Sequence, residues 1–170
     1  STLIIDEAAL ETVQDRASVV LAQRLRQVDS DGHLSMHFMT LNREQMLMIS
    51  KAKWIRFLDL EECTFTNKDF DVLAALPKLA HICVRGSNFN DNGAAGLAKC
   101  SKLNLVSAGG TALTDKGVAL LCAHKDLNFV DYNSIAITDA GLKSLGGVKN
   151  LTRVDLKGDK AITNEGIKYL

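Results

Sequence analysis

Residues 127–145 read LNFVDYNSIAITDAGLKSL and contain two patterns in succession. In the first half, the apolar Val130 and Tyr132 alternate with the polar Asp131 and Asn133, which is typical of a short strand. In the second half, Thr138 and Asp139 form a helix N-cap with a negative first turn, and leucines follow at helical spacing. The stretch therefore predicts a short strand followed by a short helix.

The same stretch recurs through most of the chain with a fixed period. Its first leucine belongs to a series with equal steps of 24 residues, made up of Ile55, Leu79, Leu103, Leu127 and Leu151. Two further apolar series lie three and five residues later, namely Leu58, Ile82, Val106, Val130 and Val154, and then Leu60, Val84, Ala108, Tyr132 and Leu156. A period of 20–29 residues with the spacing LxxLxL indicates an α/β solenoid in which every repeat adds one strand and one helix.

The helical half of the repeat has its own recurring positions. The expected N-caps are Thr66, Asn90, Thr114, Thr138 and Thr163, each followed by Asn or Asp. Gly93, Gly117, Gly141 and Gly166 lie in the first turns, where we expect them to let neighbouring helices approach closely. In the fifth copy the step between Ile137 and Ile162 is 25 residues, so we expect a bulge or a longer turn at 159–161.

The period also extends toward the N-terminus. Subtracting 24 from core positions of the first clear repeat reaches apolar residues only, namely Leu34, Met36, Leu41, Met46 and Ile49. We therefore place a degenerate first repeat at 31–54 and clear repeats from 55, 79, 103, 127 and 151, which together form a solenoid over 31–170. The segment Asp6–Val28 is amphipathic, and we expect residues 1–30 to contribute a helix that caps the first repeat.

The repeat resembles the cysteine-containing subtype of leucine-rich repeats, which reads LxxLxLxxCxxITDxGLxxL. Cys63 and Cys100 match its two cysteine positions, whereas the other copies carry Ser, Thr, Ile or Asp at the first of them. The resemblance implies a curved stack, with strands on the concave face and helices on the convex face, and a role in binding protein.

This subtype occurs in ubiquitin-ligase substrate receptors, in bacterial effectors and in a small mitochondrial group. Val13–Ala17 and Trp54–Cys63 are similar to stretches of proteins like subunit s (coupling factor B) of mitochondrial ATP synthase. A tryptophan-leucine-leucine-arginine-cysteine run of that group is absent, and Glu61 stands where it has a second cysteine. The N-terminal helix also lacks the Leu-Pro start of an F-box. This resemblance implies an accessory or assembly subunit of a respiratory complex.

Composition excludes several classes of function. Twenty basic and twenty acidic residues cancel, which argues against a nucleic-acid partner, and no apolar run is long enough to span a membrane. Four cysteines without a CxxC pair indicate an intracellular, reducing compartment, either mitochondrial or cytoplasmic. We find no catalytic motif and predict neither an enzyme nor a cofactor. We predict no metal site either, because His33 and His37 lie about 13 Å apart on an extended strand.

The candidate site is a protein-binding surface on the concave face. Strand residues between the core positions point outward there, and an apolar series containing Phe57, Leu105 and Phe129 has polar neighbours that form a rim. We assign partner binding to Phe57, Asp59, Glu61, His81, Arg85, Leu105, Phe129, Asp131, Asn133, Arg153 and Asp155. We interpret Asp131 and Asp155 as a solvated acidic face and not as a catalytic pair.

The last repeat ends at Leu170, partway through its helix. We expect Val154, Leu156, Ile162 and Ile167 to form an open apolar end that more chain or another subunit covers. The sequence therefore predicts a protein-interaction module or scaffold that works within a larger assembly.

Overall fold

The computed structural model describes residues 13–27 and 31–170, and its centre is one parallel sheet. The six strands follow the order β1-β3-β5-β6-β7-β8, and each pairs with the next in steps of 24 residues. Their bounds are β1 His33–Ser35, β3 Phe57–Asp59, β5 His81–Cys83, β6 Leu105–Ser107, β7 Phe129–Asp131 and β8 Arg153–Asp155. The 24-residue period thus gives the correct register of every strand pair in this sheet.

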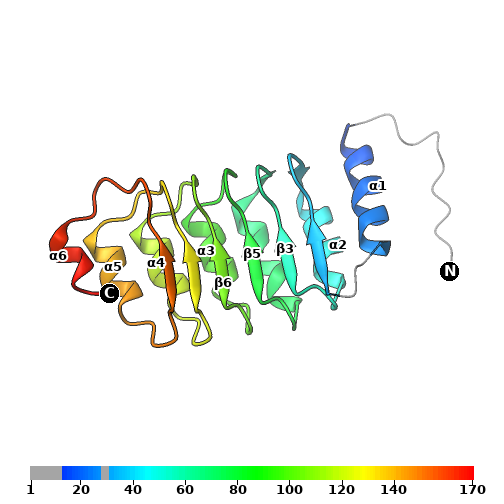
Figure 1. The fold of residues 1–170 in the computed structure, drawn as a ribbon. Coiled ribbons are helices and arrows are strands. Elements are labelled where there is room, and N and C mark those ends of the chain that lie inside the picture. Colours follow the sequence, from blue (N-terminus) through cyan, green and yellow to red (C-terminus); the bar gives the residue numbers. More distant parts are fainter. Residues whose placement is uncertain (1–12, 28–30) are drawn as a thin grey trace.

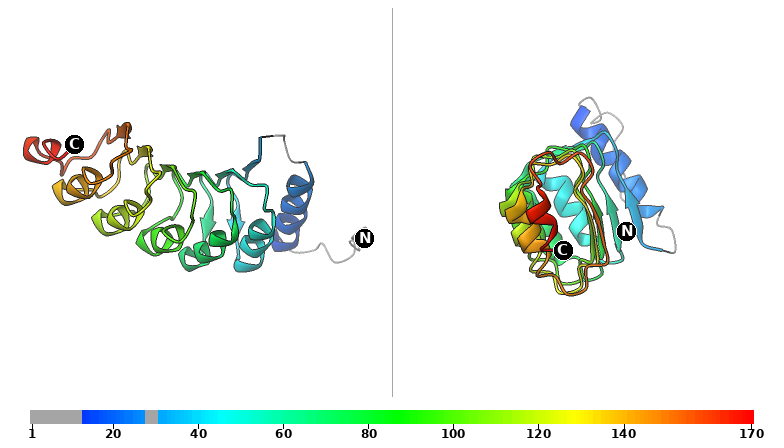
Figure 2. Two further views of the ribbon diagram at one scale, coloured as in Figure 1. Left: turned by 90° about the horizontal axis from the view of Figure 1, so that it is seen from below. Right: turned by 60° about the vertical axis from the view of Figure 1, so that its left-hand side comes forward.

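A helical segment follows each strand of this sheet and lies on the opposite side of the solenoid (Figure 1). These segments are α2 Arg43–Lys51, the 3-10 helix η2 Asn67–Ala75, α3 Asp91–Leu97, α4 Asp115–Leu121, α5 Asp139–Leu145 and α6 Asn164–Ile167. A second, two-stranded sheet pairs β2 Thr40–Leu41 with β4 Thr64–Phe65. Figure 2 shows the stack as a shallow arc with the helices along its outer side and the strands along its inner side.

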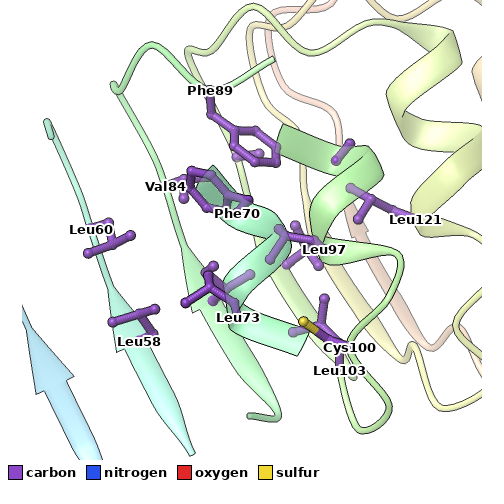
Figure 3. Packing of buried hydrophobic residues seen from close by; sticks show 14 of the residues in the cluster. Leu58, Leu60, Phe70, Leu73, Val84, Phe89, Leu97, Cys100, Leu103 and Leu121 are labelled. Atoms are coloured by element: carbon purple, nitrogen blue, oxygen red, sulfur yellow. The ribbon is translucent and has the colours of Figure 1, made fainter. Parts of the chain in front are cut away.

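The core lies between the strands and the helices. Every position of the two predicted strand series from Leu58 and Leu60 through Val130 and Tyr132 is at most 1% exposed. Figure 3 shows how these side chains meet apolar residues of the helices. Phe70 packs edge-on against Phe89, with the ring centroids 5.1 Å apart. The core is therefore one continuous apolar layer along the solenoid, as a repeat that buries its apolar side only against its neighbours requires.

Helix starts are held by contacts between successive repeats, which we call the carboxylate–threonine ladder. Its three steps are Asp91 to Thr114, Asp115 to Thr138 and Asp139 to Thr163. In the middle step, the Asp115 carboxylate accepts hydrogen bonds from the Thr138 backbone N–H at 2.8 Å and from its hydroxyl at 2.6 Å. The first residue of one helix thus fixes the N-cap of the next.

Three of the four glycines in the first helical turns, Gly117, Gly141 and Gly166, lie against carboxylates of the ladder, whereas Gly93 lies against the Phe89 ring and the Asn67 amide. A Cβ on Gly117 would lie 2.4 Å from an Asp91 carboxylate oxygen, and that oxygen accepts the Gly117 N–H at 3.1 Å. The close approach is therefore between a backbone and a carboxylate, a more specific reason than the helix packing expected from sequence.

The expected N-caps form at Asn90, Thr114, Thr138 and Thr163, whose side chains accept backbone N–H groups of the next turn. The cap expected at Thr66 is wrong, because its side chain makes no capping bond. The segment winds as a 3-10 helix, and the Thr66 carbonyl accepts the Asp69 N–H at 2.9 Å, which is the i to i+3 bond of that helix.

The turn after each strand contains one residue with positive φ, again every 24 residues. These residues are Phe38, Glu62, Gly86, Gly110, Ser134 and Gly158. Glycine adopts this left-handed conformation readily, whereas the three residues with side chains are strained there. The turn is thus a fixed element of the repeat even where glycine is missing.

The N-terminal end of the sheet lies near helix α1, Val13–Arg26, which contacts α2 and β2. Leu21 of this helix is fully buried and belongs to the core cluster. The predicted helix boundaries at Asp6 and Val28 lie outside the described residues. Across 13–27 and 31–170, no helix is long and apolar enough to cross a membrane.

At the C-terminal end, β8 pairs with β7 alone among the described strands. Val154, Leu156 and Ile162 are half-buried, and Ile167 is 52% exposed. A bulge or longer turn was expected at 159–161, and the structure has a turn at 160–161. The Asp159 carboxylate next to it accepts the Ile135 N–H at 2.8 Å.

Candidate functional site

The outward residues of the strands form a continuous series across the concave face, which we call the aromatic row. It consists of His33, Phe57, His81, Leu105, Phe129 and Arg153, and each is the Cα partner of the next. The row exists because the residues that alternate with it, such as Leu58 and Val130, point into the core.

Side chains of the aromatic row contact one another. The Phe57 and His81 rings meet edge to face with centroids 4.2 Å apart, and His33 lies 6.0 Å from Phe57. At the other end, the Arg153 guanidinium lies 4.8 Å from the centroid of the Phe129 ring, which is a cation–π distance. Phe57, His81, Leu105 and Phe129 are all half-buried, and these contacts hold their rings in place without removing them from the surface.

A shallow depression of about 170 Å³ lies over the first half of the row, lined by His33, Phe57, His81, Leu105 and the strand residues between them. Burial, and secondarily the charge of Arg56, lowers the pKa of His81 below its ordinary value of 6.5. His81 is therefore a neutral, aromatic element of the depression at neutral pH.

A polar network lies beside the row, and it overturns the interpretation of Asp131 as part of a solvated face. Asp131 is only 7% exposed, and its carboxylate accepts the Ser107 hydroxyl at 2.8 Å and pairs with Arg85 at 3.3 Å. Arg85 follows β5 and Asp131 ends β7, so this ion pair spans the intervening strand β6. A buried carboxylate with three partners, Asn133 being the third, is a structural element of this face.

Asp155 and Asn133 mark the C-terminal side of the same face. Asp155 is half-buried and accepts the backbone N–H of Lys157 at 3.1 Å, while the amide of Asn133 donates to Asp131. Together with Arg153, they place polar groups next to Phe129, as the predicted rim requires.

The N-terminal side contains a cluster of potential metal ligands, in a region where the sequence places His33, His37 and His81 near Asp59, Glu61 and Cys83 and where we predicted no metal site. His37, Asp59 and Glu61 bring a ring nitrogen and two carboxylate oxygens within 4.8 Å of one another. The sequence prediction rested on the distance between His33 and His37, whereas in the structure His37 lies next to residues of the following repeat. His37 and Glu61 occupy the same position of successive repeats, and Asp59 lies two residues before Glu61. The 24-residue step from His37 to Glu61 was therefore the available signal in the sequence.

Ser35, His37 and Asp59 have the residue types of a serine-hydrolase triad, but their geometry differs from one. The Ser35 hydroxyl and the Asp59 carboxylate both lie 2.9 Å from Nε2 of His37. A proton relay needs the serine and the carboxylate on different ring nitrogens. These three residues therefore form a local hydrogen-bond network and not a nucleophile with its base.

Phe38 is a residue that the sequence argument missed. Its side chain is 81% exposed, its φ is +57°, and its ring meets His37 edge-on at 6.4 Å. The equivalent residues in three other repeats are glycines. A bulky apolar residue that is both strained and exposed is a reason to look for a function at this position.

The cysteines are free thiols, and two of them, Cys63 and Cys100, are buried. Burial raises the pKa of Cys83, Cys100 and Cys122 to about 11. These groups are protonated at neutral pH and have little nucleophilic thiolate.

No family model and no curated protein matches this sequence. Among solved structures, similar folds occur in an internalin (inlF) from Listeria monocytogenes, with 17% identity, a TM-score of 0.52 and 78% of this chain covered. The Arabidopsis receptor kinase HAESA, solved in complex with the peptide hormone IDA and the co-receptor SERK1, has 18% identity and a TM-score of 0.54, with 74% of this chain covered. The tropomodulin C-terminal domain from Caenorhabditis elegans has 11% identity and a TM-score of 0.53, with 89% of this chain covered.

This chain spans 45% of the internalin and 21% of the HAESA chain, but 87% of the tropomodulin domain. At these identities the likeness concerns the fold alone. The fold is the leucine-rich-repeat solenoid that the LxxLxL pattern predicts.

Proposed function

We propose that this chain is a protein-interaction module that binds a segment of a partner protein on its concave face. The observation that carries the proposal is the aromatic row, whose stretch from Phe57 through His81 and Leu105 to Phe129 is aromatic or apolar and half-exposed at each residue. Exposed aromatic groups surrounded by polar ones are typical of the centre of a protein interface. Solenoids also offer their concave face as an extended binding surface.

Contacts between side chains of the row favour its use in binding. Phe57 is held against His81, and Phe129 is held under Arg153, so little side-chain entropy remains to be lost on association. The polar and charged groups at both ends of the row favour a partner segment that has apolar side chains at its centre and polar or charged residues at its flanks.

Two further expectations from sequence accompany this proposal. The four free thiols fit an intracellular, reducing compartment. Membership of the cysteine-containing repeat subtype rests on Cys63 and Cys100, whose side chains both lie in the core.

The test is comparative capture of partners from a native extract by the wild-type chain and by Phe57→Ala/Phe129→Ala. We expect the double variant to lose at least about tenfold in affinity for the captured protein, because aromatic anchors contribute roughly 1–2 kcal/mol or more each. Leu47→Ala is the matched control, since Leu47 is a 40% exposed apolar residue on the helical side.

Thermal unfolding of all three proteins separates binding from folding. Both variants should unfold within a few degrees of the wild type, because the truncated side chains are partly exposed. Equal capture by the double variant and the Leu47 variant would contradict the proposal.

A further inference from the structure

The cluster of His37, Asp59 and Glu61 has a role that the aromatic row does not explain. His37 and Glu61 lie in the turns that follow β1 and β3, Asp59 is the last residue of β3, and one potential ligand atom from each lies within 4.8 Å of the other two. In a tetrahedral zinc site with bonds of about 2.0–2.1 Å, ligand atoms lie about 3.3 Å apart. Small side-chain rotations therefore suffice to bring these atoms to coordination distance.

The backbone around the cluster is fixed on both sides. The Met36 N–H donates to the Asp59 carbonyl at 2.7 Å, and the Phe38 N–H donates to the Glu61 carbonyl at 3.3 Å. These bonds flank His37 and keep its turn in register with the next one. The Asp59 side chain is oriented as well, because one of its oxygens accepts the Glu61 N–H at 3.1 Å while the other meets His37.

Among the residues that the structure describes, no lysine or arginine forms an ion pair with Asp59 or Glu61, and the nearby Arg24 guanidinium donates to the Ser35 carbonyl. Two carboxylates face one imidazole, and the nearest arginine along the same row, Arg85, pairs with Asp131 instead. Within residues 13–27 and 31–170, the Glu61 carboxylate makes no hydrogen bond or ion pair. A bound dication would neutralise the two carboxylates and supply a partner for Glu61.

We propose that His37, Asp59 and Glu61 bind a divalent transition-metal ion, with zinc as the reference ion. An imidazole nitrogen selects against magnesium and calcium, which prefer oxygen ligands, and two carboxylates with one imidazole suit zinc. Three protein ligands leave one coordination position open to water or to a donor group of another molecule. This proposal does not depend on the identity of any protein partner.

Calorimetric titration of the metal-free protein with zinc chloride tests the site. We expect one zinc ion per chain in the wild type. His37→Ala and Glu61→Gln should each weaken binding by about tenfold or more, because each removes one of three ligands. His33→Ala is the matched control, since it removes another exposed histidine of the same repeat and should leave zinc affinity unchanged.

Two readouts on the wild-type protein make the test independent of any variant. Zinc should shift the NMR signals of the His37 ring and leave those of His81 and His124 in place. Cobalt(II) in place of zinc should give an absorption spectrum without thiolate-to-metal bands, because the proposed ligands include no cysteine. Absence of zinc binding, equal binding by the His33 and His37 variants, or a cobalt spectrum with thiolate bands would each overturn the proposal.

Discussion

The two ends of the solenoid carry the same repeat positions in different surroundings. At the N-terminal end, Leu34 and Met36 of the first repeat are 2% and 0% exposed, although this repeat has the weakest match to the pattern. At the C-terminal end, the equivalent Val154 and Leu156 match the pattern well and are only half-buried. The apolar character of a repeat position therefore does not determine its burial. Burial depends on what packs against the repeat from outside.

Helix α1 is the difference between the ends. It contacts α2 and β2, and Leu21 inserts into the core beside the first repeat. We propose on this basis that α1 caps the solenoid. The two ends then offer a direct comparison between a covered and an uncovered repeat.

Removing the buried side chain of α1 should have the largest effect on this comparison. We expect Leu21→Ala to lower the free energy of unfolding by about 2–5 kcal/mol, because it leaves a cavity at a fully buried site. Denaturant unfolding measures the loss, and amide exchange shows whether it is concentrated in β1, as a cap requires.

Val20→Ala is the control, because the neighbouring Val20 is 37% exposed and its truncation should cost less than about 0.5 kcal/mol. Similar losses in the two variants, or unchanged exchange in β1, would show that α1 does not protect the first repeat.

The turn residue with positive φ allows a second comparison of the two ends, in which one substitution should raise the free energy of unfolding and the other should lower it. Phe38 at the N-terminal end has φ +57°, while Gly158 occupies the same position near the C-terminal end with φ +88°. We expect Phe38→Gly to raise the free energy of unfolding by about 1 kcal/mol by relieving backbone strain. Gly158→Ala should lower it by about 1–2 kcal/mol, because the new Cβ would be strained and would meet the Ser134 hydroxyl at 2.6 Å.

Thermal or denaturant unfolding of both variants checks this pair. A loss of stability in Phe38→Gly would mean that the exposed ring stabilises the turn by more than the strain costs. A gain in stability together with weaker binding of a partner would identify Phe38 as a residue kept for recognition.

The smallest expected effect concerns the last step of the carboxylate–threonine ladder. Hydrogen bonds from the Thr163 hydroxyl and backbone N–H lower the pKa of Asp139 below its ordinary value of 3.8. A lowered pKa in the folded state means that the ionised form contributes stability above pH 3.8, and that this contribution is lost as the pH falls through the folded-state pKa. We expect acidification in that range to loosen α6.

The thermal midpoint of the wild type should therefore fall more steeply with acidification than that of Asp139→Asn, which lacks the titrating group. The difference between the two proteins isolates Asp139 from the other carboxylates. Parallel pH profiles would show that this step of the ladder adds no measurable stability at the exposed end.

The fold could be predicted because it depends on periodic features. The 24-residue step gives the register of β1 through β8, including the first repeat, where composition alone hides the pattern. N-cap residues likewise mark helix starts, because capping is a local interaction. The predicted N-cap at Thr66 does not form, because the segment is a 3-10 helix with i to i+3 hydrogen bonds. No distinct local sequence signal marks such a helix.

The surface was harder to predict, because its contacts join different repeats. Phe57 and Phe129 could be placed on one row by counting, but the buried Asp131 pairs with Arg85 across an intervening strand. The grouping of His37 with Asp59 and Glu61 likewise needs diagonal distances between neighbouring strands. The repeat period identifies the neighbours of each residue on the adjacent strands, but it does not give how far each side chain extends.

The carboxylate–threonine ladder has a consequence for how such a chain changes in evolution. Because Asp91, Asp115 and Asp139 each hold the threonine of the following repeat, deleting residues 115–138 would bring Asp139 into the place of Asp115 and Thr163 into the place of Thr138. Every new junction would then join groups of the same chemistry as the old one. Insertions and deletions of one whole repeat should therefore be tolerated, whereas a change of a few residues breaks the sequence of acceptors and donors. Length in this protein is expected to vary in steps of one repeat.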